Sequence, residues 1–128
     1  MTSSAPTDLT TIVLRFNDGI NLRDIDGLAS LMTDDHAFID SAGTTTRGKD
    51  HVLAAWRGFF QSVPDYKNVF ERVMAKGNVV TVVGRSTCSY APLDGPALWV
   101  ARIEDDKVAE WRVYEDGPET RTQLGVMD

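Results

Sequence analysis

The chain of 128 residues is 42% hydrophobic and 25% charged, with a formal net charge of -6 at pH 7. These values are typical of one soluble globular domain, and we expect a single domain over residues 1–128 in which residues 1–7 form a flexible N-terminus. The Lys and Arg residues are scattered singly and no apolar run is long enough to span a membrane, so no nucleic acid or membrane partner and a cytoplasmic location are expected.

Helical periodicity dominates the first half of the chain. A first helix is predicted from Leu9, because apolar residues recur at positions i, i+3, i+4, i+7 and i+11. A short second helix is predicted after Asp24 and carries apolar residues as far as Met32. The acidic pair at 34–35 is expected to end this helix ahead of a brief strand over residues 37–40.

A third helix follows a polar loop over residues 41–47. It is predicted from Gly48 to Val63, where apolar residues again follow the helical period, and Pro64 prevents the helix from continuing. The residues expected on its buried face are Val52, Leu53, Trp56, Phe59, Phe60 and Val63.

Beyond Pro64 the hydrophobic period becomes nearly twofold, which predicts four strands. They are expected over residues 66–75, 79–90, 97–104 and 107–115. Gly, Asn, Asp and Pro residues between them mark turns, so consecutive strands must pair antiparallel as a meander. Three amphipathic helices followed by such a sheet indicate an α+β fold in which the helices cover one face and the other face still needs a cover.

The order and spacing of short segments identify a resemblance that runs from about Leu9 to Gly125. The N-terminal half resembles ketosteroid isomerase, in Asn-Leu-Arg-Asp-Ile-Asp-Gly-Leu at 21–28, Leu31, Asp-Asp at 34–35, Asp-Ser-Ala-Gly at 40–43 and Arg-Gly at 47–48. Later segments resemble SnoaL-like polyketide cyclases of the same nuclear-transport-factor-2-like (NTF2-like) superfamily, in Trp56, Phe-Phe at 59–60, Pro-Asp-Tyr at 64–66, Glu-Trp-Arg at 110–112 and Gln-Leu-Gly at 123–125.

This resemblance implies a single SnoaL-like domain with the fold of an NTF2-like cone. In that fold, a cystatin-like α+β roll, three N-terminal helices pack on a curved antiparallel sheet around a central pocket. The resemblance also implies a cofactor-independent enzyme that acts on a small hydrophobic substrate bearing a carbonyl or hydroxyl group. Relatives commonly dimerise through the outer face of the sheet, so a homodimer through that face is expected. Fold alone does not determine the reaction.

Asp40 is the first candidate catalytic residue. It stands where the isomerase relatives carry the aspartate that moves a proton between substrate carbons. A base that removes a proton next to a carbonyl needs donors for the charge that arrives on oxygen, but the positions matching those donors hold Phe16 and Trp99. The relatives' own reaction is therefore not expected. Alternatively, Asp40 is a turn residue that accepts hydrogen bonds from the amides that follow it.

Two further acids are candidate catalytic residues at the end of the last strand. The twofold period places Trp111, Val113 and Glu115 on one face, so Glu115 faces the pocket if Trp111 does. Asp116 can then reach the rim of the pocket. In a pair of carboxyl groups with separated pKa values, one can act as the general acid and the other as the general base. The alternative is that both acids form a solvated end of the strand.

The predicted substrate-binding residues are mainly aromatic, because core and pocket share one interior in this fold. Limonene-epoxide hydrolases are similar in their last strand but carry an aspartate where this chain has Val113. Epoxide opening is therefore not expected, although Arg85 can orient an anionic or carbonyl group. Alternatively, Arg85 is a cation on the surface of its strand. The full predicted set is Phe16, Trp56, Phe60, Tyr66, Arg85, Trp99, Trp111 and Val113.

Metal and covalent chemistry are not expected. His36 and His51 fall on different predicted elements without a third ligand, and Cys88, expected within a strand, has no basic partner. Two functions remain. One is an enzyme of proton transfer, for isomerisation, cyclisation or dehydration. The other is a non-catalytic small-molecule-binding or dimerisation domain, which applies if the large rings fill the cone.

Overall fold

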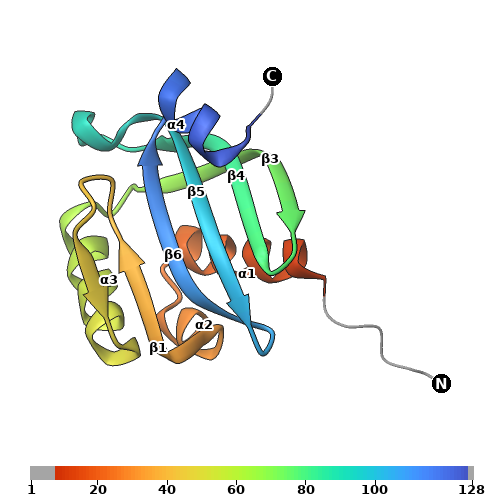
Figure 1. Ribbon diagram of the computed structural model, residues 1–128. Helices are drawn as coiled ribbons and strands as arrows, with labels where there is room; N and C mark the ends of the chain where they lie inside the picture. The colour runs from red at the N-terminus through yellow and green to blue at the C-terminus, as the bar shows by residue number, and fades with distance from the viewer. Residues whose placement is uncertain (1–7, 127–128) are drawn as a thin grey trace.

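Six strands form one curved sheet in the computed structural model, which describes residues 8–126 (Figure 1). The predicted flexible N-terminus, residues 1–7, lies outside this range. The fold is α+β, with four α-helices in the described part of the chain. In chain order the elements are α1 (Leu9–Leu22), α2 (Ile25–Ser30), β1 (Met32–Ile39), β2 (Thr45–Arg47), α3 (Lys49–Ser62), β3 (Lys67–Lys76), β4 (Val79–Thr87), the 3-10 turn η1 (Ala91–Leu93), β5 (Gly95–Glu104), β6 (Lys107–Glu115) and α4 (Pro118–Leu124).

The strands lie in the order β2-β1-β6-β5-β4-β3. Strands β3 to β6 pair antiparallel with their neighbours in sequence, so the predicted meander is confirmed. Strand β1 pairs antiparallel with β2 but parallel with β6, where Phe38 stands opposite Trp111. The prediction of a wholly antiparallel sheet is therefore wrong. No tight hairpin joins β1 to β6, so nothing in the local chain forces these two strands to run in opposite directions.

The second helix is shorter than the sequence pattern predicts. Strand β1 begins at Met32, so Asp34 and Asp35 lie within a strand and do not end a helix. The carbonyl of Leu31 accepts a hydrogen bond of 2.7 Å from the N–H of Val108, which starts the pairing with β6 in place of another helical turn. Both aspartates are exposed at a bulge of β1, where they remain hydrated.

Three other boundaries also differ from prediction. The expected loop over residues 41–47 contains the short strand β2, whose pairing with β1 the sequence period does not reveal. Strand β4 ends at Thr87, so Cys88 follows the strand and lies half-buried beyond it. Helix α4 was not predicted. Its Pro118 occupies the first turn, where a backbone N–H has no helical partner in any case.

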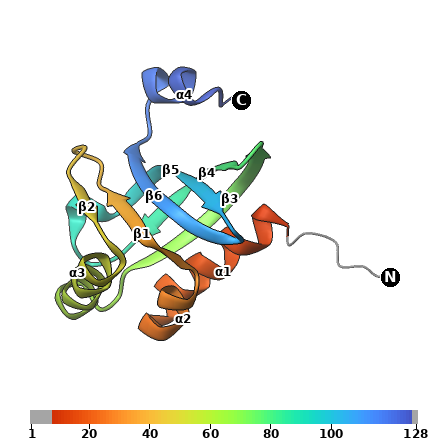
Figure 2. The ribbon, with the colours of Figure 1, turned by 60° about the horizontal axis from the view of Figure 1, so that its bottom comes forward.

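The helices cover the two faces of the sheet unequally, as Figure 2 shows. Helices α1, α2 and α3 lie on one face, over the main hydrophobic core, and α4 lies on the other. On that outer face Val83 and Leu98 pack with Val126, which follows α4. The chain itself therefore covers part of the outer face, and the homodimer through this face stays a prediction. None of the helices in residues 8–126 is long and apolar enough to cross a membrane.

Candidate functional site

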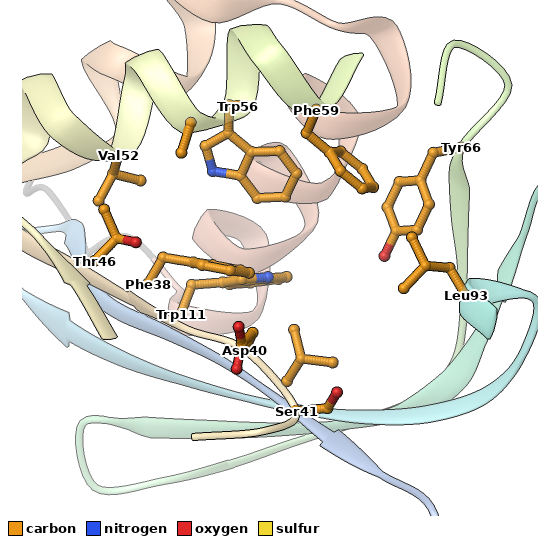
Figure 3. A pocket seen from close by; sticks show the side chains of 12 residues that line it. Phe38, Asp40, Ser41, Thr46, Val52, Trp56, Phe59, Tyr66, Leu93 and Trp111 are labelled. Carbon is orange, nitrogen blue, oxygen red and sulfur yellow. The ribbon is translucent and has the colours of Figure 1, made fainter. Parts of the chain in front are cut away.

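A cavity of about 320 Å³ lies between α3, the ends of β1 and β6, and the loop that carries η1 (Figure 3). This volume is at the lower end of the range of small-molecule pockets, about 300–1,000 Å³. The wall is mostly apolar, and its polar groups are one carboxyl, three hydroxyls and the indole N–H groups of two tryptophans. The lining residues are Phe38, Asp40, Ser41, Thr46, Val52, Ala55, Trp56, Phe59, Tyr66, Leu93, Trp111 and Val113.

Contacts between aromatic rings fix the wall on the side of α3. The Trp56 ring meets Phe38 edge-on with 5.5 Å between centroids, and it stacks on Phe60 at 5.4 Å. The Phe59 ring meets Tyr66 edge-on at 4.8 Å. Because these rings connect β1, α3 and the start of β3, the cavity has a defined shape without a ligand.

Asp40 has the positions that both interpretations of its sequence context require, in a turn and at the cavity. Its Oδ1 accepts hydrogen bonds from the backbone N–H groups of Ala42 at 3.0 Å and Thr44 at 2.9 Å, as the turn interpretation predicts. The same side chain lines the cavity, and Figure 3 shows its carboxylate beside the Trp111 ring. Within residues 8–126 no hydrogen bond to Oδ2 is found. The turn therefore orients the carboxylate and leaves one oxygen uncommitted.

Tyr66 provides a second polar group with fixed partners. Its hydroxyl lies 3.0 Å from Ser86 Oγ, and that Oγ donates to Asn68 Oδ1 at 2.8 Å. Burial raises the pKa of the Tyr66 phenol, and the hydrogen bonds with Ser86 and Asn68 only partly oppose this effect. The phenol is therefore neutral at physiological pH.

The structure brings five of the predicted site residues together. Asp40, Trp56, Tyr66, Trp111 and Val113 all line the cavity, although they come from four separate parts of the chain. Strand β6 contributes two of them at alternate positions, as the twofold period predicts.

Three predicted binding residues pack into the solid core and do not line the cavity. Phe16 and Trp99 are fully buried, and the Phe16 ring lies 4.6 Å from the ring of Trp111. Phe60 is also buried, behind Trp56. Periodicity gives the face of an element on which a side chain lies, but not its depth, so these rings fill the space next to the cavity.

The other predicted polar residues lie away from the cavity. Glu115 is exposed at the end of β6, as its solvated alternative predicts. Asp116 pairs with Arg121 of α4 through hydrogen bonds of 2.7 and 2.9 Å, which hold the pKa of Asp116 below its usual value. Arg85 is exposed, and it lies on the outer face because it is two residues from Val83 along β4. Neither Asp116 nor Arg85 lines the cavity in this structure.

Seven lining residues were not among the predicted binding residues. Two of them, Val52 and Phe59, were expected on the buried face of the third helix. Strand alternation places Phe38 on the face of Asp40, so this residue was also detectable. The remaining four have no periodic signal, because they lie in turns, on the short strand β2 or on the exposed side of α3. They are Ser41, Thr46, Ala55 and Leu93.

The two histidines lie on different elements and differ in their exposure to solvent. His36 is fully buried on β1, and its Nδ1 lies 2.6 Å from the carbonyl oxygen of Val108. A carbonyl only accepts, so Nδ1 carries the hydrogen. Burial lowers the pKa of His36, and the weaker opposing effects of Val108 and Asp35 do not reverse this. His51 is exposed on α3, and no cluster of three potential metal ligands is found in the described residues.

The buried His36 predicts a pH-dependent stability. Because its pKa is lower in the folded chain than the ordinary value of 6.5, the unfolded chain binds a proton more readily. We expect the free energy of unfolding to fall as the pH drops below 6.5, by up to about 1.4 kcal/mol per pH unit from this residue. Urea denaturation between pH 8 and pH 5 measures this effect.

The matched control for this prediction is His36→Phe, which keeps a ring beside Phe16 and removes the titrating group. This variant lacks the hydrogen bond to Val108, so we expect its free energy of unfolding to be lower than that of the wild type at neutral pH. Below pH 6.5 this free energy should fall less steeply with pH than in the wild type. Identical slopes for the wild type and the variant would show that His36 binds its proton equally in both states.

Comparison with known proteins agrees with this architecture. A family model described as the SnoaL-like domain matches residues 13–111. No curated protein matches the chain at a significant level. Among solved structures, a candidate polyketide cyclase from Sinorhizobium meliloti superimposes with a TM-score of 0.74 at 17% identity, over 80% of this chain and 93% of the other.

Two other solved structures are similar over most of the chain. A cystatin-fold protein from Novosphingobium aromaticivorans has a TM-score of 0.75 at 20% identity, over 85% of this chain and 99% of the other. An epoxide hydrolase of the LEH-like type from Mycobacterium tuberculosis has a TM-score of 0.74 at 20% identity, over 84% of this chain and 82% of the other. At these identities the similarity establishes the fold and not the reaction.

Proposed function

Because the chain belongs to the SnoaL-like domain family, we propose that it binds a small hydrophobic molecule in the cavity and transfers a proton without a cofactor. Asp40 is the proposed general base. The observation that supports this most strongly is the hydrogen bonding of its carboxylate, which lines a mostly apolar cavity. Two amides hold one oxygen, and the other oxygen is uncommitted. A base that is already oriented needs little reorganisation when a substrate arrives.

The proposed first step is removal of a proton from a carbon next to a carbonyl group. The C–H bond breaks, its proton goes to the Asp40 carboxylate, and its electron pair forms an enolate. The hydroxyl groups of Ser41 and Thr46 line the cavity and can rotate to donate to the enolate oxygen. Return of the proton to another carbon completes an isomerisation. Attack of the enolate carbon on a second carbonyl gives a cyclisation, the reaction type for which the Sinorhizobium relative is named.

A second candidate function is binding without catalysis. The observation that favours it is that no donor faces the cavity from the two positions that supply donors in ketosteroid isomerase. Phe16 and Trp99 occupy them, and both rings belong to the packed core. Binding of a ketone without exchange of its acidic hydrogens would identify this second function.

Occupation of the cavity is tested by closing its mouth. Ala55 lines the cavity from the exposed side of α3, so an indole at this position covers the entrance. We expect Ala55→Trp to raise the dissociation constant of 2-tetralone, a flat hydrophobic ketone, by about tenfold or more. Titration followed by protein NMR measures the affinity and shows which residues respond.

Ala54→Trp is the matched control. Ala54 is also exposed on α3, one residue earlier, but it does not line the cavity. This variant should bind 2-tetralone like the wild type. Equal affinity of both variants for the ketone would place its binding site elsewhere, and no binding to the wild type would contradict the proposed function for ketones.

A further inference from the structure

A chain of buried hydrogen-bonding side chains ends at the cavity. Tyr66 is only 8% exposed, and Figure 3 shows its hydroxyl directed toward the space between Trp111 and Leu93. Behind it, the side chains of Ser86 and Asn68 are buried almost completely. Because these groups are shielded from bulk water, the hydroxyls of Tyr66 and Ser86 and the amide oxygen of Asn68 depend on one another for hydrogen bonds.

The direction of the hydrogen bonds follows from the orientation of the Asn68 amide, whose Oδ1 faces Ser86 while its buried Nδ2 has no partner among the described residues. Ser86 has one hydroxyl hydrogen, which it donates to Asn68 Oδ1 at 2.8 Å. Its oxygen is left to accept, so the Tyr66 hydroxyl at 3.0 Å donates to Ser86. Tyr66 has no second hydrogen and therefore presents only oxygen lone pairs to the cavity. Its phenol is an acceptor for a ligand and not a donor.

Contacts with α1 hold this chain in place. The backbone N–H of Asn68 donates to Asn21 Oδ1 at 2.8 Å, and Asn21 Nδ2 donates back to the Asn68 carbonyl at 2.9 Å. Asn17 Nδ2 donates to the same carbonyl at 3.3 Å. Three hydrogen bonds therefore hold the backbone of Asn68, and a rotation of its side chain away from Ser86 would break the buried hydrogen bond between them.

The charges at the cavity also restrict its ligand. The carboxylate of Asp40 is, like Tyr66, an acceptor only, and no Lys, Arg or His side chain is found among the lining residues. An anionic ligand would lie close to this carboxylate with no cation among the lining residues to balance it, so the two negative charges would repel each other. A ligand with a hydrogen-bond donor satisfies the acceptor that Tyr66 presents.

We propose that the cavity selects uncharged, flat hydrophobic ketones that also carry a phenolic or enolic hydroxyl group, which donates its hydrogen to Tyr66 Oη. This inference rests on the proposed function, because it specifies the ligand class of the same cavity. Ser86 is a positioning residue in this arrangement. It engages the only hydrogen of the phenol and thereby determines that Tyr66 accepts.

Three naphthalene probes of similar shape test the selection. They are 2-naphthol, which carries a donor, 2-methylnaphthalene, which has no polar group, and 2-acetylnaphthalene, which only accepts. We expect 2-naphthol to bind the wild type about tenfold more tightly than 2-methylnaphthalene, the effect of one buried hydrogen bond. Protein NMR titration gives the three dissociation constants and the location of each probe.

Two variants assign the selection to Tyr66 and Ser86. Tyr66→Phe keeps the ring against Phe59 but removes the acceptor, so the preference for 2-naphthol over 2-methylnaphthalene should fall to about twofold or less. Ser86→Ala releases the hydrogen of Tyr66, so the phenol can donate to a ligand. In this variant 2-acetylnaphthalene should bind about tenfold more tightly than it binds the wild type.

The outcomes separate this inference from the proposed function. Cavity binding of all three probes with no preference for 2-naphthol, or with the same preference in Tyr66→Phe, overturns the selection by Tyr66 and leaves a small-molecule cavity intact. Binding of no probe overturns both. If Ser86→Ala does not fold, as its NMR spectrum will show, the comparison of the wild type with Tyr66→Phe still decides the role of the acceptor.

Discussion

Trp111→Ala is expected to lower the free energy of unfolding by about 3–5 kcal/mol, the range found when a buried large aromatic side chain is removed. Trp111 is fully buried on β6, and its ring lies 4.6 Å from Phe16 and 6.3 Å from Phe70. It also lies opposite Phe38 in the parallel pairing of β1 with β6. The residue therefore connects α1, β1 and β3, and its loss leaves a hole next to an existing cavity.

Tyr90→Ala is the control for this loss of an aromatic ring. Tyr90 is 54% exposed in the loop before η1. Its backbone carbonyl accepts hydrogen bonds from Cys88 Sγ and from the N–H of Leu93. We expect a change within about 0.5 kcal/mol, as for most surface substitutions. Urea denaturation compares the two variants with the wild type. Similar losses of stability in both would mean that Trp111 does not hold these elements together.

Local patterns in the sequence predicted the elements whose formation depends on nearby residues. Helix α1 and the long helix α3 follow the apolar period of 3.6 residues, and Pro64 ends the second of these patterns. Strands β3 to β6 follow the twofold period and are separated by short turns. Each of these signals is complete within a window of about 15 residues, which is why sequence reading identifies them.

Contacts between distant parts of the chain were not predictable in the same way. The parallel partner of β1 is β6, which lies about 70 residues later in the chain. No local feature of Asp34 and Asp35 distinguishes a bulged strand from the end of a helix. Helix α4 was missed because a Gly-Pro pair after a strand is typical of a loop. Proline is nevertheless common in a first helical turn, where Pro118 lies. The ion pair of Asp116 with Arg121 was missed with it.

The candidate site could be predicted in part for the same reasons. Asp40 was identified through the resemblance to ketosteroid isomerase, and Trp56 and Trp111 through periodicity and the resemblance to SnoaL-like proteins. All three line the cavity. Phe16 and Trp99 also face the interior, but the boundary between filled core and open cavity depends on packing in three dimensions. Arg85 was named as a substrate-binding residue, but its alternation with the buried Val82 places it on the outer face, as the alternative of a surface cation requires.

Asp40→Asn is expected to reduce the rate of proton transfer by about 10²–10⁴-fold, the usual contribution of a general base. The variant keeps a side-chain oxygen that can accept hydrogen bonds from the amides of Ala42 and Thr44. The turn is therefore retained, and the free energy of unfolding should change by less than about 1 kcal/mol. Only the capacity to take up a proton is lost.

Asp40→Ala separates the catalytic role from the structural one. It removes both hydrogen bonds of the turn as well as the base, so we expect a loss of about 1–3 kcal/mol in stability in addition to the loss of rate. If the two variants lose the same stability, the turn does not depend on the side chain of Asp40, and its carboxylate is not oriented in the way proposed.

The most direct measurement is the uptake of deuterium from heavy water at the carbons next to the carbonyl of 2-tetralone, followed by proton NMR. With the wild-type protein we predict exchange well above the rate in buffer, and with Asp40→Asn a rate about 10²–10⁴-fold below that of the wild type, or as slow as the rate in buffer. Equal acceleration by the two proteins would contradict the assignment of Asp40 as the base of this cavity.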